Sequence, residues 1–178
     1  MTSRIVIIGA GGFGREALDV VEAINADSAT VVFEMLGFVD SSPSELTLER
    51  LHSRGAKWLG PLEVMASLDR TVGYLIGIGN PSVRERIDGE LTALGFEAAT
   101  AVHPAASVGS GSHIAAGSIV CGGAQLSTNV DLRRHVHVNP NATIGHDTVL
   151  HDHVSINPAA VIRETSSSVP ARSSVPAR

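Results

Sequence analysis

The chain has 178 residues, a net charge of −5 and 43% hydrophobic residues, enough to bury the core of one ordinary domain or two small ones. The acidic balance argues against a nucleic-acid-binding protein, because phosphate-binding surfaces carry clustered Lys and Arg. No apolar run has the length of a membrane span, no secretory signal opens the chain, and the single Cys121 has no internal disulfide partner. We therefore expect a cytoplasmic protein with no nucleic-acid or membrane partner.

Residues 1–100 are predicted to form a Rossmann-like α/β domain with a small parallel sheet. Short β-branched runs that read as strands alternate with stretches of helical periodicity. The strands are expected at 4–8, 31–39, 73–78 and 98–102, and the helices at 15–26, 45–54, 62–68 and 83–94.

A glycine-rich loop, residues 9–14, matches G-x-G-x-x-G between the first strand and the first helix. Such glycines let the backbone approach a pyrophosphate, which the N–H groups at the helix N-terminus attract. Asp40, at the end of the second strand, could accept hydrogen bonds from a ribose or a base edge. The short sheet leaves little room for a dinucleotide, so we expect a mononucleotide diphosphate. The alternative is a turn needed only for strand-to-helix packing.

Residues 101–165 are predicted to form a left-handed parallel β-helix of hexapeptide repeats. Aliphatic side chains recur every six residues, and a small or β-branched side chain follows four residues after each. The aliphatic positions are Val102, Val108, Ile114, Val120, Leu126, Leu132, Val138, Ile144, Leu150, Ile156 and Ile162. A triangular solenoid produces this period, with residues eighteen apart stacked, such as His135 under His153. Residues 166–178 repeat Ser-Val-Pro-Ala-Arg and are predicted to be a low-complexity tail.

Five of the eight histidines fall between His135 and His153. They could act as a base, ligate a metal or line a solvated surface, and three that converged on one point could hold zinc. For His135, His137 and His151 we favour exposed turn positions. We expect no metal.

Several segments, taken in order, resemble the NeuD/PglD-like family of sugar O-/N-acetyltransferases, which are hexapeptide-repeat acyltransferases. They cover most of the chain and are specific as an ordered set. The matching segments are residues 7–16 (Ile-Ile-Gly-Ala-Gly-Gly-Phe-Gly-Arg-Glu), 37–40 (Gly-Phe-Val-Asp), 78–80 (Ile-Gly-Asn) with Arg84, 102–106 (Val-His-Pro-Ala-Ala) and 139–147 (Asn-Pro-Asn-Ala-Thr-Ile-Gly-His-Asp).

The resemblance implies a homotrimer whose N-terminal domain binds the UDP part of an amino sugar and whose β-helix binds the co-substrate acetyl-CoA between subunits. It implies that His146 is the general base, because a neutral imidazole can take a proton from a sugar amine or hydroxyl. Asp147 or another carboxylate would orient that imidazole, Asn139 would lie near the acceptor, and His153 and Asn157 would line the acetyl-CoA site. The residues expected to bind the nucleotide sugar are Gly9, Gly11, Gly12, Phe13, Gly14, Asp40, Gly79 and Asn80.

Three features depart from the family pattern. Gly145 stands where some members carry an acidic residue, and Phe13 stands where some carry a histidine. The resemblance also implies further coils after Ile162 that carry much of the acetyl-CoA site, and residues 166–178 do not continue the hexapeptide repeat.

Three functions remain open from the sequence. The first is an acetyltransferase acting on the amine of a UDP-linked 4-amino-4,6-dideoxy sugar, or on the hydroxyl of a sialic acid. The second is a non-catalytic nucleotide-sugar-binding or scaffold protein that lost its acetyl-CoA site through C-terminal shortening. The third is a histidine-zinc hydratase.

Overall fold

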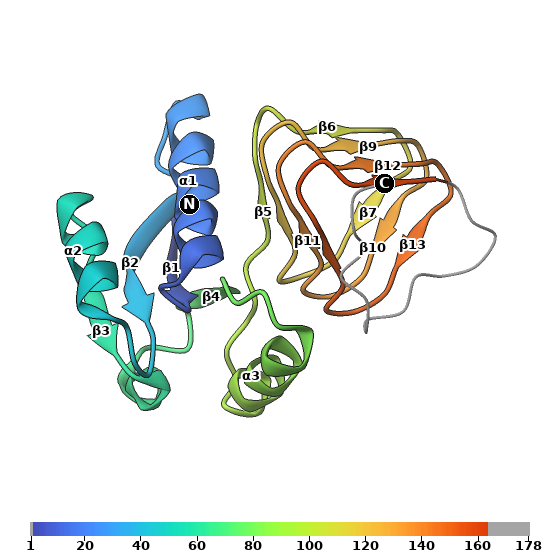
Figure 1. Ribbon diagram of the computed structural model, residues 1–178. Helices are drawn as coiled ribbons and strands as arrows, with labels where there is room; N and C mark the ends of the chain where they lie inside the picture. Colours follow the sequence, from blue (N-terminus) through green and yellow to red (C-terminus); the bar gives the residue numbers. More distant parts are fainter. Residues whose placement is uncertain (1, 164–178) are drawn as a thin grey trace. The chain divides into compact units, whose positions relative to one another are not determined.

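The computed structural model describes residues 2–163 and divides the chain into two compact units, between Ala99 and Thr100 (Figure 1). The elements of the first unit are β1 (Ser3–Ile8), α1 (Gly12–Asp27), β2 (Phe33–Val39), α2 (Glu45–Ser53), β3 (Trp58–Gly60), the 3₁₀ helix η1 (Leu62–Ser67), β4 (Gly73–Ile76) and α3 (Pro81–Ala93). The four strands pair in parallel in the order β3-β2-β1-β4, which confirms the predicted α/β sheet. The tail predicted at residues 166–178 lies outside the described residues.

Two details of the first unit differ from the sequence-based expectation. The edge strand β3 was not predicted, and residues 62–67 form a 3₁₀ helix where an α-helix was expected. Both segments are short. Six residues complete few α-helical hydrogen bonds, so the tighter 3₁₀ geometry is an accessible alternative.

Strand β1 lies at the centre of the sheet, and its residues 5–8 are almost completely buried. A continuous apolar run is typical of a parallel strand covered on both faces. Helix α1 begins against the ends of β1 and β4 with no side chain between them. A Cβ at Gly14 would overlap the carbonyl oxygen of Gly9, and a Cβ at Gly77 would overlap the Cα of Gly14. This close approach fixes the glycine-rich loop at the carboxyl ends of the strands.

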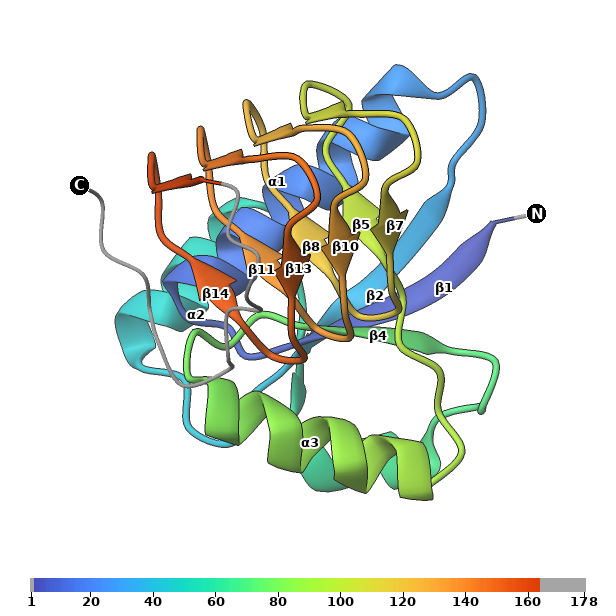
Figure 2. The same ribbon diagram turned by 90° about the vertical axis from the view of Figure 1, so that its right-hand side faces the viewer.

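The second unit is a left-handed parallel β-helix, as predicted, with two-residue strands stacked in three sheets (Figure 2). The sheets have the orders β14-β11-β8-β5, β15-β12-β9-β6 and β13-β10-β7. The strands are β5 (Ala101–Val102), β6 (Ser107–Val108), β7 (His113–Ile114), β8 (Ile119–Val120), β9 (Gln125–Leu126), β10 (Asp131–Leu132), β11 (His137–Val138), β12 (Thr143–Ile144), β13 (Val149–Leu150), β14 (Ser155–Ile156) and β15 (Val161–Ile162). Paired residues are eighteen apart, as in Val138 opposite Val120 and Ile156.

The aliphatic residues of the six-residue repeat fill the interior of the prism. From Val120 to Ile156 every one of them is at most 2% exposed, and Ile162 is 6% exposed. Val108 departs from the pattern and is 41% exposed. It lies on β6, which is the first strand of its sheet and pairs only with β9, so no coil covers it from below.

Each corner of the prism from residue 111 to residue 159 contains one residue with left-handed backbone geometry, three positions after an aliphatic residue. These residues stack into three columns along the edges of the prism. We name the columns by their last members: the Asp147 edge (Gly111, Asn129, Asp147), the His153 edge (Gly117, His135, His153) and the Ala159 edge (Gly123, Asn141, Ala159), all with φ between 52° and 80°. Glycine, asparagine, aspartate and histidine tolerate this conformation best, so backbone geometry alone favours these residue types at the corners.

Replacing Ile144 with Ala tests the inward column. Ile144 is fully buried, so the loss of its methyl groups is expected to lower the free energy of unfolding by about 2–5 kcal/mol. Val161, on the neighbouring strand β15, is 54% exposed, and Val161→Ala should change stability by at most about 0.5 kcal/mol. Thermal or urea denaturation followed by circular dichroism measures both, and equal effects would contradict the inward assignment.

Candidate functional site

A cavity of about 240 Å³ opens in the first unit at the carboxyl ends of β1, β2 and β4. It is lined by Ile8, Gly9, Val39, Asp40, Ser41, Leu62, Glu63, Ile78, Arg86, Ile87 and Glu90. Strand β2 pairs with one side of β1, and β4 pairs with the other side. The cavity therefore lies at the point where the order of the strands in the sheet reverses. Open α/β sheets bind ligands in this position. Two predicted substrate-binding residues, Gly9 and Asp40, belong to the lining.

Asp40 holds the glycine-rich loop in place. One oxygen of its carboxylate accepts a hydrogen bond from the backbone N–H of Ala10 at 2.8 Å, and the other accepts one from that of Ser42 at 3.0 Å. Gly9 has φ +94°, a conformation that glycine adopts without strain. The carboxylate predicted to contact a ligand therefore also shapes the loop that lines the cavity.

Gly11 and Gly12 differ from the packed glycines of the loop. Both are exposed, and a Cβ built on either would meet nothing within 4 Å. Helix α1 starts at Gly12, and no side chain caps its first N–H groups. Packing does not explain glycine at these two positions. The open space and the uncapped N–H groups fit the predicted anion site, which stays a prediction.

The segment between β4 and α3 contains the predicted residues Gly79 and Asn80. The side-chain oxygen of Asn80 caps α3 by accepting from the N–H groups of Ser82 at 3.0 Å and Val83 at 3.3 Å. Arg84 is fully buried, and its Nη1 donates to the carbonyls of Ile78 at 2.8 Å and Gly79 at 3.0 Å. Burial lowers the pKa of Arg84 to about 10, which leaves it protonated at neutral pH. These contacts give Asn80 and Arg84 structural tasks, and their role toward a ligand stays a prediction.

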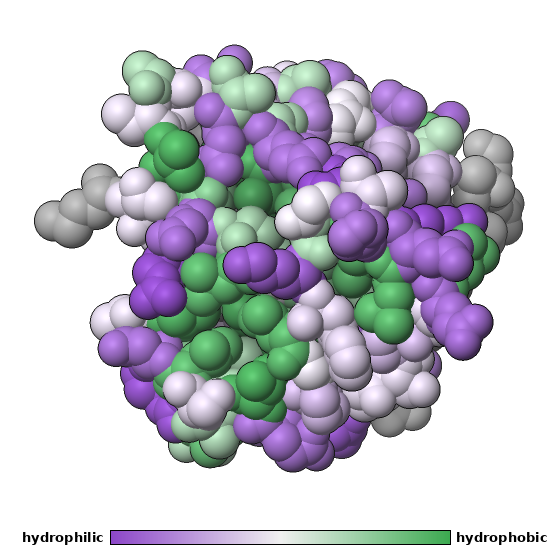
Figure 3. All heavy atoms as spheres, turned by 90° about the vertical axis from the view of Figure 1, so that its left-hand side faces the viewer, coloured by the Kyte–Doolittle hydropathy of each residue, from purple (hydrophilic) through white to green (hydrophobic). Residues whose placement is uncertain are grey.

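A second cavity of the first unit, about 300 Å³, lies between α1, β2 and the α2–β3 turn. Its guanidinium, Arg54, is already paired at 2.6 Å with both Asp19 and Glu22. On the face drawn in Figure 3, hydrophobic patches alternate with hydrophilic side chains. The large hydrophobic residues exposed on this unit are Val31, Leu46, Trp58 and Leu94. Neither the second cavity nor this set of exposed hydrophobic residues contains a residue that the sequence predicts to bind a ligand. The first cavity is therefore the candidate site.

In the β-helix, His146 and Asp147 lie in the turn between β12 and β13. The His146 Nδ1 is 2.7 Å from the Asp147 Oδ2, and the Asn129 amide donates to the Asp147 Oδ1 at 3.0 Å from the coil below. The hydrogen bond from His146, followed by that from Asn129, lowers the pKa of Asp147 below its usual value. Both side chains of the pair are accessible, at 52% and 63% exposed. The predicted contact between His146 and Asp147 is therefore present, and the orienting role of the carboxylate stays a prediction.

The other predicted β-helix residues lie on different edges of the prism. Asn139 and Asn157 occupy the turns of the Ala159 edge, and the Asn139 amide donates to the carbonyl of Ile156 at 2.6 Å. His153 lies on the His153 edge, and its ring stacks on that of His135 with centroids 5.5 Å apart and an interplanar angle of 5°. Within one chain, the predicted catalytic and acetyl-CoA residues are therefore divided among all three edges.

Two histidines were wrongly expected at exposed positions. His135 and His137 are both 0% exposed, whereas His151 is half-buried. The ring of His135 lies over Gly117, where a Cβ would overlap it, and under His153. His137 is a strand residue of β11, in register with Ile119 and Ser155 of the adjacent coils. Stacking between coils buries these rings, so a histidine in or beside a turn of the β-helix is not exposed for that reason alone.

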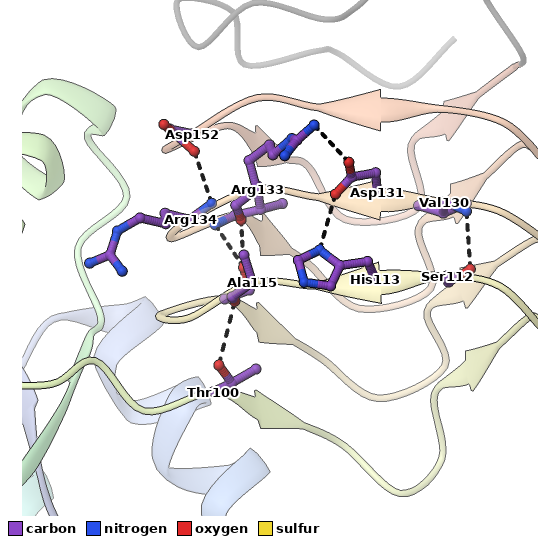
Figure 4. A network of polar contacts seen from close by, with 11 residues as sticks. Thr100, Ser112, His113, Ala115, Val130, Asp131, Arg133, Arg134 and Asp152 are labelled. Carbon is purple, nitrogen blue, oxygen red and sulfur yellow. Dashed lines mark hydrogen bonds and ion pairs between the residues drawn. The ribbon is translucent and has the colours of Figure 1, made fainter.

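Sequence reasoning also missed a polar network on the sheet β13-β10-β7 and the adjoining turns (Figure 4). The His113 Nδ1 lies 3.2 Å from the Asp131 Oδ1, and the Arg133 guanidinium lies 2.9 Å from the Asp131 Oδ2. The backbone N–H of Arg134 donates to the Asp152 carboxylate at 2.9 Å. His113 and Asp131, like Arg134 and Asp152, are eighteen residues apart, so the repeat length could have identified both contacts.

Within residues 2–163, no group of three or more His, Cys, Asp or Glu side chains is arranged to hold a metal ion. None of the helices in that range is both long and apolar enough to cross a membrane.

Residues 4–91 match the family model described as the PglD N-terminal domain. GDP-perosamine N-acetyltransferase from Escherichia coli O157:H7 is 26% identical over 159 residues, which are 86% of this chain and 67% of the relative. The acetyltransferase domain of PglB from Neisseria gonorrhoeae FA1090 is 27% identical with a TM-score of 0.75, over 90% of this chain and 73% of that domain. WeeI from Acinetobacter baumannii AYE is 25% identical with a TM-score of 0.74, over 89% of this chain and 71% of WeeI.

A likeness of fold extends to a histidine-to-alanine mutant of GDP-perosamine N-acetyltransferase from Caulobacter crescentus, in complex with CoA and GDP-perosamine. Its TM-score is 0.75 at 21% identity, over 88% of this chain and 70% of that one. The family resemblance read from the motifs is confirmed: residues 4–91 form a PglD N-terminal domain, and the chain is homologous to acetyltransferases of the NeuD/PglD family.

Proposed function

We propose that the protein transfers an acetyl group from acetyl-CoA to the amine of a nucleotide-linked 4-amino-4,6-dideoxy sugar. The predicted class of enzyme, an acetyl-CoA-dependent sugar acetyltransferase, is confirmed by the relatives. An amine acceptor is supported over a sialic acid hydroxyl because the Escherichia coli relative is an N-acetyltransferase. That relative is named for a GDP-linked sugar, so the predicted UDP group remains a hypothesis.

The observation that carries the proposal is the contact between His146 and Asp147. The carboxylate, held ionised by its hydrogen bonds, favours the imidazole tautomer with its proton on Nδ1. The lone pair then lies on Nε2, the nitrogen that would accept a proton from the substrate. This is the arrangement of a general base oriented by a carboxylate.

In the proposed reaction the sugar nitrogen attacks the thioester carbonyl carbon of acetyl-CoA. The Nε2 of His146 takes the proton that the nitrogen loses, the carbon–sulfur bond breaks, and the thiolate of CoA leaves and takes up a proton. The products are the N-acetylated sugar nucleotide and CoA. Acidification should slow the reaction, because an imidazolium cannot accept the proton.

The first test removes the base and its orienting group. His146→Ala should lower kcat by about 10²- to 10⁴-fold. Asp147→Asn should lower it by about 10²-fold or more, because an amide that donates to Nδ1 selects the wrong tautomer. The measurement is steady-state release of CoA with an amino-sugar nucleotide.

His113→Ala is the matched control, since His113 is also an accessible histidine beside a carboxylate. Its kcat should stay within about twofold of the wild type, because a surface ion pair contributes little to the fold. Circular dichroism verifies that each variant is folded. Full activity in His146→Ala, or an equal loss in His113→Ala, would remove His146 from the mechanism.

The distribution of the predicted residues supports a trimer as the active form. His146 lies on the Asp147 edge and His153 on the His153 edge, so the two side chains occupy different edges of one prism. Two prisms packed side by side can bring different edges together. In a cyclic trimer every interface would then combine the same two edges, one from each neighbour.

Complementation between inactive variants tests this shared site. His146→Ala and His153→Ala should each be impaired as homotrimers. When they are co-expressed and mixed at random, about one interface in four pairs an intact His146 with an intact His153, so about a quarter of the wild-type activity should return. No recovery, in a mixed trimer verified by light scattering and mass spectrometry, would show that the site does not combine His146 of one subunit with His153 of its neighbour.

A further inference from the structure

The cavity of the first unit has an apolar floor and an acidic rim. Aliphatic side chains of β1, β2, η1 and α3 form the floor. The charged residues around it are Asp40, Glu63, Glu90 and Arg86, so three carboxylates face one guanidinium. This excess of negative charge is unexpected at a site for a diphosphate, which is itself an anion. It suggests that the phosphates lie elsewhere and that the cavity receives a part of the ligand rich in hydrogen-bond donors.

Two of the three carboxylates are already engaged. Asp40 accepts the N–H groups of Ala10 and Ser42, and Glu90 pairs with Arg86 at 2.6 Å. Glu63, which comes from the separate element η1, forms no hydrogen bond or ion pair within residues 2–163. Glu63 is therefore the carboxylate at this cavity with the capacity to bind a ligand.

The position of the cavity fits the nucleoside end of a sugar nucleotide. Gly9 belongs both to the cavity lining and to the loop that leads to the exposed backbone of Gly11 and Gly12. A diphosphate at the N-terminus of α1 would thus place its nucleoside at the cavity. The volume of about 240 Å³ is below the roughly 300–1,000 Å³ of pockets that enclose a whole small-molecule ligand, so only part of the sugar nucleotide would enter.

A carboxylate distinguishes the nucleobases by their donor groups, because it only accepts hydrogen bonds. Guanine presents two adjacent donors, N1–H and the N2 amino group, which match both oxygens of one carboxylate. Uracil presents a single N3–H between two carbonyl oxygens, and these would repel the carboxylate oxygens. An aliphatic floor without aromatic rings accepts the face of either base. The hydrogen-bonding edge of the base, which would contact Glu63, distinguishes guanine from uracil.

We propose that this cavity holds the base of the sugar nucleotide and that Glu63 makes it select guanine over uracil. The proposal rests on the proposed nucleotide-sugar acceptor and names its nucleotide. It proposes a guanine nucleotide in place of the UDP that the family resemblance implied. Glu63 belongs to none of the sequence motifs that carried that resemblance.

Equilibrium binding of GDP and UDP to the full chain, measured by calorimetry, tests the selection. The wild type should bind GDP about tenfold or more tightly than UDP, the effect of one well-placed charged hydrogen-bond pair. In Glu63→Gln the amide NH₂ group faces the guanine donors, so GDP affinity should fall by about tenfold or more while UDP affinity stays the same or rises. Glu85→Gln, which removes an exposed carboxylate from α3 outside the cavity, should keep the wild-type ratio.

Each contrary outcome has a defined meaning. If UDP binds as tightly as GDP or more tightly, or if Glu63→Gln leaves the ratio unchanged, the selection is wrong, while acetyl transfer to a sugar nucleotide still stands on its own assay. If neither nucleotide binds, both the selection and the proposed nucleotide-linked acceptor are overturned. A tenfold loss in Glu85→Gln would show that overall charge, and not Glu63, sets the affinity.

Discussion

The β-helix depends on one requirement of the backbone: the chain must turn a corner every six residues, and each corner from residue 111 to residue 159 includes a left-handed residue. Side chains that tolerate this conformation are few, and outside glycine they are mainly asparagine, aspartate and histidine. These are also residue types that orient bases and bind polar ligands. Asp147 and His153 thus fit their edges for a conformational reason, and the proposed chemistry would use side chains that the turn geometry already favours. The same repeat that fills the core with aliphatic side chains distributes the polar residues over three edges.

The first unit depends on an equally local contact, the direct packing of Gly14 against Gly9 and Gly77. Because no side chain separates the start of α1 from the strand ends, the exposed backbone of Gly11 and Gly12 lies next to the cavity that Gly9 lines. The hydrogen bond that the Ala10 N–H donates to the Asp40 carboxylate then holds the loop in place. In the proposed site, backbone N–H groups of the loop would hold the phosphates, and the Glu63 side chain would add selectivity for the base.

Periodicity made most of the fold predictable. The six-residue repeat identified the β-helix and its stacking, and the alternation of β-branched and helical segments identified the parallel sheet. The repeat could not show that Val108 lies uncovered in the first coil, or that His135 and His137 are buried between coils. Those facts depend on what lies above and below each residue. The short strand β3 has too few residues to carry a pattern of its own.

The candidate site was predictable where one segment carries it and unpredictable where several do. His146 and Asp147 are adjacent in sequence, and the structure brings their side chains into contact. The cavity combines residues of β1, β2, η1 and α3, so the acidic rim and the uncommitted Glu63 could be recognised only after folding.

Acetyl transfer itself is the central claim. Its most direct measurement is a mass-spectrometric assay of the wild-type chain with acetyl-CoA and a panel of nucleotide-linked amino sugars. We predict equal amounts of N-acetylated sugar nucleotide and free CoA with at least one 4-amino sugar, and no product when the amino group is replaced by a hydroxyl. Binding of a sugar nucleotide without any acetylated product, under conditions in which the protein is trimeric, would contradict the account and indicate a binding protein instead of an enzyme.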